Sequence, residues 1–267
     1  MRDCGNDRPD DDIIRAKEDK LREWFTRHCD PIRKIIDGLD IGWGGVQRWA
    51  TRRMPAIDGP HLDLACGYAT FLAQLGWRFP ESCLIGLNID YSGPHALASS
   101  LLNQAGVTAT LVQADARQTP FADGIFTSAS CFLGLQDIQI GFGKDGVRQA
   151  VAETIRVLQF NGALTLLDTF SIKQFQDLLD DLPILVVDHG ERHLNVHWDR
   201  QVAERAIELY ADGWVTQIRL SKQTTQDRTW DGIHHQMAEE MEHQLATQGY
   251  YTPFGPVRMV VARKLKP

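Results

Sequence analysis

The sequence predicts an α/β fold, with a doubly wound, mostly parallel sheet of seven strands of the Rossmann-like type. After Gly59-Pro60, short apolar runs alternate with helical patterns of about ten residues, which is typical of βαβ units. Right-handed crossovers then place helices on both faces of the sheet. Near the C-terminus, two further apolar runs fit an antiparallel pair at one edge. The chain of 267 residues, 43% of them hydrophobic, is long enough for one such domain.

The individual elements follow from apolar periodicity and from turn residues. Strands are expected at 61–65, 84–88, 110–113, 125–131 and 163–168, and helices between them at 70–78, 94–105 and 147–158. The last hundred residues differ in pattern. They predict an acidic helical insert at about 171–188, helices at 199–211 and 231–248, and strands at 214–222 and 255–264.

The N-terminal part has its own organisation. Residues 1–11 are polar and acidic, and they predict a disordered tail because they contain almost nothing to bury. Helical spacing over 12–36 is interrupted at Asp30-Pro31, since proline favours a helix start. A glycine-rich loop at 38–45 precedes a basic helical stretch at 46–54. We expect 12–56 to form a helical extension or lid.

Charge and composition exclude several classes of protein. The net charge of −7 gives no support to a nucleic-acid-binding face, which would show clustered Lys and Arg. No apolar run reaches the roughly 18 residues that span a membrane, and the polar start differs from a secretory signal. The five cysteines lack CxxC spacing, so we expect no structural zinc, no disulfide framework and a cytoplasmic location.

The segment HLDLACGYATFLAQLG contains the first functional signal. A strand runs directly into a turn of small residues around Gly67, and a helix follows. Glycine permits a tight turn and close approach of the backbone to a ligand. The N–H groups at the start of the helix favour an electronegative ligand group. One such turn is weak evidence, because many α/β proteins have one.

Polar side chains at three consecutive strand ends strengthen this signal. Asp63 lies in the first strand, Asn88 ends the second with Asp90 close behind, and Asp115 follows the third. In open α/β sheets, ligands bind outside the carboxyl ends of the strands, and a polar residue after the second strand holds a ribose. These residues therefore predict a nucleoside site. The alternative is that the carboxylates only cap loops or helices.

At this point the sequence resembles the class I S-adenosylmethionine-dependent methyltransferases of the small-molecule type. LDLACGYAT is similar to their first motif, and GLNIDYS to their second-strand segment. QADARQTPFADGIFTSAS resembles the stretch that contacts the adenine and leads into the fourth strand. VAETIRVLQFNGALTLLD resembles their fifth-strand region, with Phe160-Asn161-Gly162 in place of the usual Pro-Gly-Gly. The resemblance covers about residues 60 to 170.

The resemblance implies S-adenosylmethionine as cofactor and a role for each matching position. The first turn would surround the methionine moiety, Asn88 would face the ribose hydroxyls, and Asp115 would accept from the adenine amino group. Cys131 and Phe132 would lie near the sulfonium. The cofactor-binding residues implied in this way are Asp63, Ala65, Cys66, Gly67, Asn88, Ile89, Asp115, Ala116, Cys131 and Phe132. The chain departs from the family pattern at Ala69, where a glycine is usual, and at Asn88, where an acid is usual.

Methyl transfer is an in-line displacement with a good leaving group, so positioning can supply most of the catalysis. A base is needed only where the acceptor must lose a proton. The candidates for catalysis are His193, His197 and Asp137, with His189 in the same histidine-rich stretch. On a helix, the i, i+4 spacing of the three histidines would place them on one face. A metal site there is an alternative, but Gly190 argues against a continuous helix, so none is expected.

Two residues of the glycine-rich loop are candidates for a lid. Trp43 and Gly44 precede the first strand, and the aromatic ring could close over the cofactor or the acceptor. Anchoring the N-terminal helices to the sheet is an equal alternative for Trp43. In this interpretation residues 57–267 form the methyltransferase domain, with an acceptor-binding insert at about 171–213.

Two rival functions stay open at this stage. An NAD-dependent oxidoreductase would require a fuller GxGxxG turn than residues 66–70 supply. A non-catalytic nucleoside-binding subunit that regulates or scaffolds a partner would tolerate both Ala69 and Asn88. We expect a small-molecule methyl acceptor, no nucleic acid and no membrane, and the sequence leaves a homodimer open. Fold alone does not determine the acceptor atom.

Overall fold

The computed structural model describes residues 11–28, 44–193, 197–220, 230–252 and 255–266. Its centre is a seven-stranded sheet in the order β3-β2-β1-β4-β5-β7-β6. The pairs among β1 to β5 are all parallel, whereas β7 runs antiparallel to both β5 and β6. The predicted α/β fold with a mostly parallel sheet is therefore confirmed. The strands are β1 (His61–Leu64), β2 (Leu84–Asn88), β3 (Ala109–Gln113), β4 (Phe126–Phe132), β5 (Leu158–Asp168), β6 (Ile184–Arg192) and β7 (Val257–Lys264).

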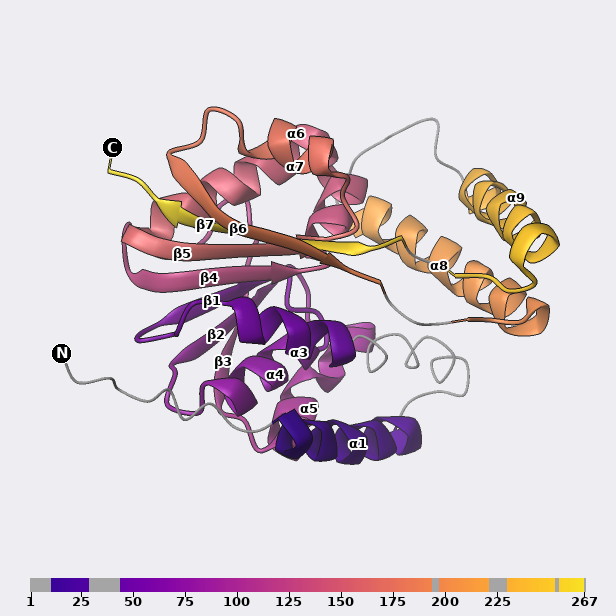
Figure 1. Cartoon of the computed structure of the whole chain (residues 1–267), viewed down its shortest axis with the longest axis horizontal. Helices are drawn as coiled ribbons and strands as arrows, with labels where there is room; N and C mark the ends of the chain where they lie inside the picture. The colour runs from indigo at the N-terminus through magenta and orange to yellow at the C-terminus, as the bar shows by residue number, and fades with distance from the viewer. Residues whose placement is uncertain (1–10, 29–43, 194–196, 221–229, 253–254, 267) are drawn as a thin grey trace.

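Helices cover both faces of the sheet (Figure 1). One layer holds α1, α3, α4 and α5, which contact one another, and α6 and α7 pack together on the opposite face. The helices are α1 (Asp11–His28), α3 (Gly44–Arg53), α4 (Thr70–Arg78), the 3₁₀ turn η1 (Gly93–Leu97), α5 (Ala98–Ala105), α6 (Gly134–Val157), α7 (Ile172–Leu179), α8 (Arg200–Leu220) and α9 (Trp230–Gln248). Within the described residues, none of these helices is long and apolar enough to cross a membrane.

Buried charges, together with the buried Ile14 and Leu21, fix the helix α1 to the other helices of its layer. It begins at Asp11, one residue before the expected start, and Asp11 pairs with Arg78, whose side chain is only 4% exposed. Glu18, also buried, pairs with Arg48 of α3 and accepts from Gln74 of α4. Removing one partner from such a pair leaves an uncompensated buried charge, which is strongly destabilising. The position of α1 therefore depends on complete pairing.

Two predictions for the C-terminal part are wrong. Residues 214–220 belong to α8 and are not a strand. One helical stripe of apolar residues continues through positions 203, 206, 207, 210, 211, 214 and 218. This helical repeat outweighs the short strand-like alternation of apolar and polar residues after Gly213. Residues 184–188, expected to be helical, begin β6, whose run of β-branched residues pairs with β7. Only Ile172–Leu179 of the acidic insert is a helix, and Ser171 caps it.

Close packing between α4 and the loop before β3 depends on Gly76. A Cβ atom at this position would lie inside van der Waals contact of the Val107 side chain. Valine is stiff at χ1, so it cannot turn away without moving its backbone. The glycine therefore sets how near α4 approaches β3.

We predict that Gly76→Ala destabilises the protein by up to about 2 kcal/mol in urea unfolding. The substitution gains about 1 kcal/mol of helix propensity, but overpacking typically costs 1–3 kcal/mol. Gly45→Ala is the matched control, because the nearest atom to that Cβ is Arg48 Nη2 at 3.7 Å. The double variant Gly76→Ala/Val107→Ala should lose less stability than the two single losses added together. Simple additivity would contradict the proposed contact.

Candidate functional site

The turn between β1 and α4 has an unusual backbone. Ala65, Gly67 and Ala69 all adopt left-handed conformations, with φ of 50°, 50° and 65°. Only glycine does so without penalty, because a Cβ atom meets the carbonyl oxygen that follows. Ala69 is also fully buried and directly precedes α4. Ala69, which stands where the family usually has glycine, therefore adopts a left-handed conformation and adds strain to the turn.

This turn touches the start of α6. A Cβ atom on Gly134 would lie 2.5 Å from Ala65 Cβ and 3.0 Å from Cys131 Sγ. Real Cβ atoms do not approach so closely, so glycine is required for β1 and β4 to end side by side in this way. Gly134 was not singled out from the sequence. The small residue directly after an apolar strand was the available signal.

Asp63 is the most perturbed carboxyl group of the site. It is 1% exposed, and Ser130 Oγ of β4 donates to its Oδ1 at 2.6 Å. Among the described residues, its buried Oδ2 has no hydrogen-bond partner. Burial raises the pKa of Asp63 to about 7, against the opposing effect of the Ser130 hydrogen bond. A buried carboxylate oxygen without a partner is costly, so this position suits a cationic or hydrogen-bond-donating ligand.

A second buried carboxyl group, Asp168, ends β5. Its Oδ2 accepts from the backbone N–H of Gln136 at 3.1 Å, and its Oδ1 from that of Thr169 at 2.7 Å. Asp168 thereby caps the first turn of α6 from a neighbouring strand. Burial raises its pKa to about 6, although these hydrogen bonds oppose the rise. The charges of Asp168 and Asp63 both act on Cys131 in β4, which lies between them in the sheet.

The loop after β2 forms a compact polar network. Asn88, only 5% exposed, donates through Nδ2 to the carbonyl oxygen of Asp90 at 2.6 Å, and its Nδ2 lies 3.1 Å from His95 Nδ1. The carboxylate of Asp90 accepts instead from the backbone N–H and hydroxyl of Ser92. Asp90 therefore caps its own turn and does not take the place of Asn88. Ile89 lies half-buried between Asn88 and Asp90.

Asp115 follows β3 and pairs with a nearby arginine. Its oxygens accept from the backbone N–H, Nε and Nη2 of Arg117 at 2.6–3.1 Å. Partial burial alone would raise the pKa of Asp115, but the hydrogen bonds and charge of Arg117 lower it below its ordinary value. The Arg117 guanidinium lies 3.5 Å from the ring centroid of Phe142 in α6. Ala116, beside this pair, is buried.

Four residues around the first turn were missed by the sequence reasoning. Tyr91 donates to the carbonyl oxygen of Gly86 at 3.1 Å, so the thiol of Cys66, 3.2 Å away, is the donor to the tyrosine oxygen. Tyr68 and His95 meet edge to face at 5.2 Å. Ser130 is the fourth. Tyrosine and histidine in loops carry no distinctive spacing, whereas Ser128 and Ser130 alternate in β4 as His61 and Asp63 do in β1.

The catalytic candidates lie apart from one another. Asp137 is exposed in the first turn of α6, next to the strand ends. His189 lies on β6, and His193 follows it, exposed. His197 stacks on Tyr250 at 3.9 Å between ring centroids. The structure thus does not place these histidines on one helical face. Within the described ranges, His, Cys, Asp and Glu side chains do not gather in a group of three or more that could hold a metal.

The lid candidates are described only in part. Trp43 lies outside the described residues, and Gly44 is the first residue of α3. Phe132, at the end of β4, stacks on Phe71 of α4 with centroids 4.9 Å apart. Cys131 is 1% exposed. The implied positions around Asp63, Asn88, Asp115 and Phe132 all lie at the carboxyl ends of β1 to β4.

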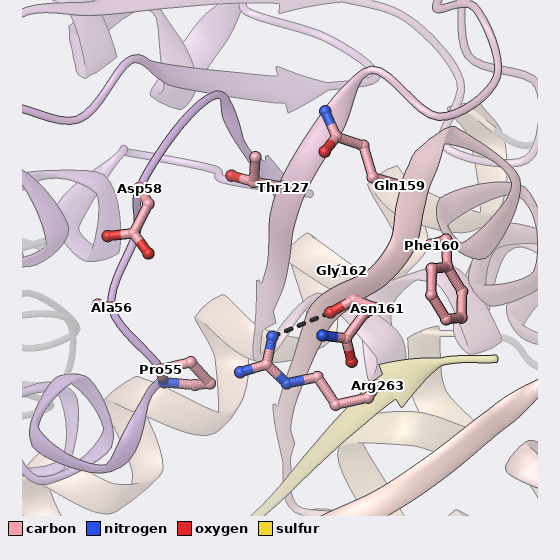
Figure 2. A pocket seen from close by; sticks show the side chains of 9 residues that line it. All are labelled: Pro55, Ala56, Asp58, Thr127, Gln159, Phe160, Asn161, Gly162 and Arg263. Atoms are coloured by element: carbon pink, nitrogen blue, oxygen red, sulfur yellow. Dashed lines mark hydrogen bonds between the residues drawn. The ribbon is translucent and has the colours of Figure 1, made fainter. Parts of the chain in front are cut away.

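A hollow of about 320 Å³ opens at the opposite end of the strands from Asp63. Figure 2 shows Arg263 reaching into it from β7, with its Nη1 donating to the Asn161 carbonyl oxygen at 2.9 Å. Asp58 lies across from it, on the loop before β1. Because the amino ends of β4 and β5 border this hollow, it is separate from the strand ends that hold Asp63.

Comparisons with known proteins agree with this geometry. Residues 62–162 match the family described as methyltransferase domain. No protein of curated function matches the sequence. Many solved structures share the fold. A putative methyltransferase from Bacillus halodurans C-125 has a TM-score of 0.57 and 16% identity, covering 83% of this chain and 100% of its own.

Two further structures with this fold are enzymes with different activities. The geranyl diphosphate C-methyltransferase from Streptomyces coelicolor A3(2), in complex with Mg²⁺, geranyl diphosphate and S-adenosyl-L-homocysteine, has a TM-score of 0.53 and 12% identity. The match covers 89% of this chain and 84% of that one. The [4+2]-cyclase SpnF has a TM-score of 0.52 and 14% identity, over 84% of this chain and 80% of its own.

The likeness to these structures shows the fold, and the match over residues 62–162 adds the family of the segment that contains the site. That segment begins in β1 and ends at Gly162 in β5. The resemblance seen in the sequence is confirmed. Residues 62–162 carry a methyltransferase domain, on the fold of the class I S-adenosylmethionine-dependent methyltransferases.

Proposed function

We propose that this chain transfers a methyl group from S-adenosylmethionine to a small-molecule acceptor and releases S-adenosylhomocysteine. The observation that carries the proposal is Asp63 Oδ2, a buried carboxylate oxygen without a partner among the described residues, beside a left-handed turn. The cofactor has an ammonium group and a sulfonium, and both are cations. The charges of the residues present suit this cofactor, because a nearby cation would stabilise the ionised forms of the buried carboxyl groups of Asp63 and Asp168.

Each part of the cofactor has a proposed partner. Asp63 and the turn around Gly67 would hold the methionine moiety, and Asn88 and Ile89 the ribose. Asp115 and Ala116 would face the adenine. Three donors of Arg117 already bond the carboxylate of Asp115, which leaves about one of its roughly four acceptor positions for the adenine. S-adenosylmethionine supplies the methyl group, and the side chains of this chain orient it.

The sheet order argues against the oxidoreductase alternative. A dinucleotide-binding sheet of the doubly wound type has the order 3-2-1-4-5-6 with all strands parallel. Here β7 lies antiparallel between β5 and β6. The turn after β1 also lacks two of the three glycines of the dinucleotide fingerprint. A non-catalytic nucleoside-binding subunit is the alternative that the experiment below must exclude.

We propose that the acceptor binds between the strand ends and the segment that joins β6 to β7. This segment contains α8 and α9, and α8 contacts α6. Figure 1 shows both helices beyond the end of the sheet where β5 finishes and β7 begins. The insert proposed at 171–213 then contributes through α8, and the N-terminal extension 12–56 is proposed to close the site.

Among the candidate bases, Asp137 has the best position. It lies in the first turn of α6, directly after β4, and its charge contributes to raising the pKa of Cys131. His193 and His197 come after β6, which β5 and β7 separate from β4. A base is required only for an acceptor that must lose a proton. We therefore propose Asp137 as the base. His193 and His197 are proposed only to contact the acceptor.

The first prediction of the proposal concerns binding and turnover. Isothermal titration calorimetry should show binding of S-adenosylhomocysteine and S-adenosylmethionine, and no binding of NAD. Incubation with S-adenosylmethionine and a panel of alcohols, amines, thiols and prenyl diphosphates should yield a methylated product, detected by mass spectrometry. Binding without any methylation would favour the nucleoside-binding subunit. Binding of NAD alone would overturn the proposal.

The second prediction concerns Asp63→Asn. The folded-state pKa of about 7 lies above the ordinary 3.8. The stability that Asp63 gives is therefore present below about pH 4 and is lost as the pH rises through 7. The cofactor-free variant should be more stable than the wild type at pH 8, by up to roughly 4 kcal/mol, and about equal at pH 4.

The same variant should bind S-adenosylhomocysteine at least about tenfold more weakly, because a neutral amide replaces the partner of its ammonium. Thermal unfolding and calorimetry measure the two effects. Asp145→Asn, at an exposed position of α6, is the matched control and should change neither. A variant that loses stability at pH 8 would show that Asp63 is not destabilising when charged.

A further inference from the structure

Four polar side chains form a continuous hydrogen-bonded row inside the sheet. His61 and Asp63 alternate along β1, and they stand opposite Ser128 and Ser130 of β4 in the strand register. His61 Nδ1 lies 2.8 Å from Ser128 Oγ, His61 Nε2 lies 2.9 Å from Ser130 Oγ, and Ser130 Oγ lies 2.6 Å from Asp63 Oδ1. All four residues are at most 5% exposed. No element of the proposed function explains His61.

Counting hydrogens fixes the direction of every bond in this row. An ionised Asp63 can only accept, so the single hydroxyl hydrogen of Ser130 points to Asp63. Ser130 Oγ must then accept from His61 Nε2–H, and because burial keeps the ring neutral, His61 Nδ1 accepts from the hydroxyl of Ser128. This order requires a neutral imidazole with its hydrogen on Nε2. Burial lowers the pKa of His61 to about 3, which agrees with a neutral ring.

The row ends at the proposed cofactor. Ser130 occupies Oδ1 of Asp63, and the other oxygen, Oδ2, is buried without a partner among the described residues. We infer that His61 is a positioning residue, which holds the hydroxyl hydrogen of Ser130 on Asp63 Oδ1 and leaves Oδ2 for the ammonium of S-adenosylmethionine. This inference rests on the proposed function, because it takes the cofactor as the ligand of Oδ2.

The row also makes cofactor binding depend on pH. The ammonium requires a charged Asp63, whereas burial raises the pKa of this carboxyl to about 7 in the free protein. The thiols and the phenol near Asp63 stay neutral in this range. The pKa of the Cys66 thiol is raised to about 12, and those of Tyr91 and Cys131 are also raised. Asp168, whose pKa is about 6, also ionises in this range, but its hydrogen bonds go to the backbone of Gln136 and Thr169 and not to the row, so the Ser130 and His61 variants report on Asp63.

Affinity should therefore fall as the pH drops below about 7, and the row should set the midpoint. Loss of the Ser130 hydroxyl removes a hydrogen bond to the charged form of Asp63, so its pKa rises further. A hydrogen bond to a charged group contributes about 1.5–3 kcal/mol, which corresponds to an upward shift of about one to two pH units. Loss of His61 should shift the midpoint in the same direction by less.

The experiment measures the dissociation constant of S-adenosylhomocysteine by calorimetry between about pH 5 and pH 9. The variants are Ser130→Ala, Ser130→Thr, His61→Phe and His61→Gln. Threonine keeps the hydroxyl, and glutamine keeps one donor and one acceptor, so both should restore the wild-type midpoint. Thr154→Val removes a buried hydroxyl that bonds only within α6, and it controls for general destabilisation. An unshifted midpoint in His61→Phe would overturn the inference, whatever the midpoint of Ser130→Ala.

A second measurement requires no ligand. Nitrogen-15 NMR of the free protein should show one histidine that stays neutral down to about pH 4 and carries its hydrogen on Nε2 at pH 8. Its signal should vanish in His61→Gln. A charged ring or an Nδ1–H tautomer at pH 8 would overturn the inference. Failure of the wild type to bind S-adenosylhomocysteine would overturn the proposed function and this inference together, whereas normal binding with unshifted midpoints would overturn this inference alone.

Discussion

The contact between two turns is the constraint on which the site depends. The turn after β1 and the start of α6 after β4 meet where Gly134 lacks a side chain, and a Cβ atom there would lie 2.5 Å from Ala65 Cβ. This contact lets Asp168 of β5 reach the backbone of Gln136 and cap α6. The ends of three adjacent strands are thereby held together, and Asp63 and Asp168 are both excluded from water.

This arrangement is energetically unfavourable in the protein alone. Two buried carboxyl groups have raised pKa values, and two alanines adopt left-handed backbone in one turn. Strain and unpartnered polar groups of this kind persist only where the surrounding structure fixes them, and they concentrate at functional sites. Here the fully buried strand β1 and the apolar faces of α4 and α6 supply that structure. A cationic ligand would relieve the electrostatic part and leave the backbone strain unchanged.

The sequence predicted the repeating βα part well, because buried parallel strands give continuous apolar runs and their turns need small residues. It failed at 214–220 and at 184–188, where helical and strand periods compete over a few residues. At the candidate site, it singled out strand-end residues such as Asp63 and Asn88, whose role stays a prediction. It missed Ser130 and His61, because a hydrogen bond across two strands depends on register. The alternating H-x-D and S-x-S patterns contained that information, but only the pairing of β1 with β4 made it specific.

The antiparallel strand β7 separates the proposed cofactor site from the proposed acceptor site along the chain. Because β7 reverses direction, the connection from β6 starts and finishes at the carboxyl edge of the sheet, where α8 and α9 lie (Figure 1). The cofactor residues come from β1 to β4, whereas this connection comes from the last third of the chain. Substitutions in α8 or α9 would therefore change the proposed acceptor wall without disturbing the His61–Ser130–Asp63 row. One scaffold can then serve different acceptors, which agrees with the range of chemistry that the fold carries in other proteins.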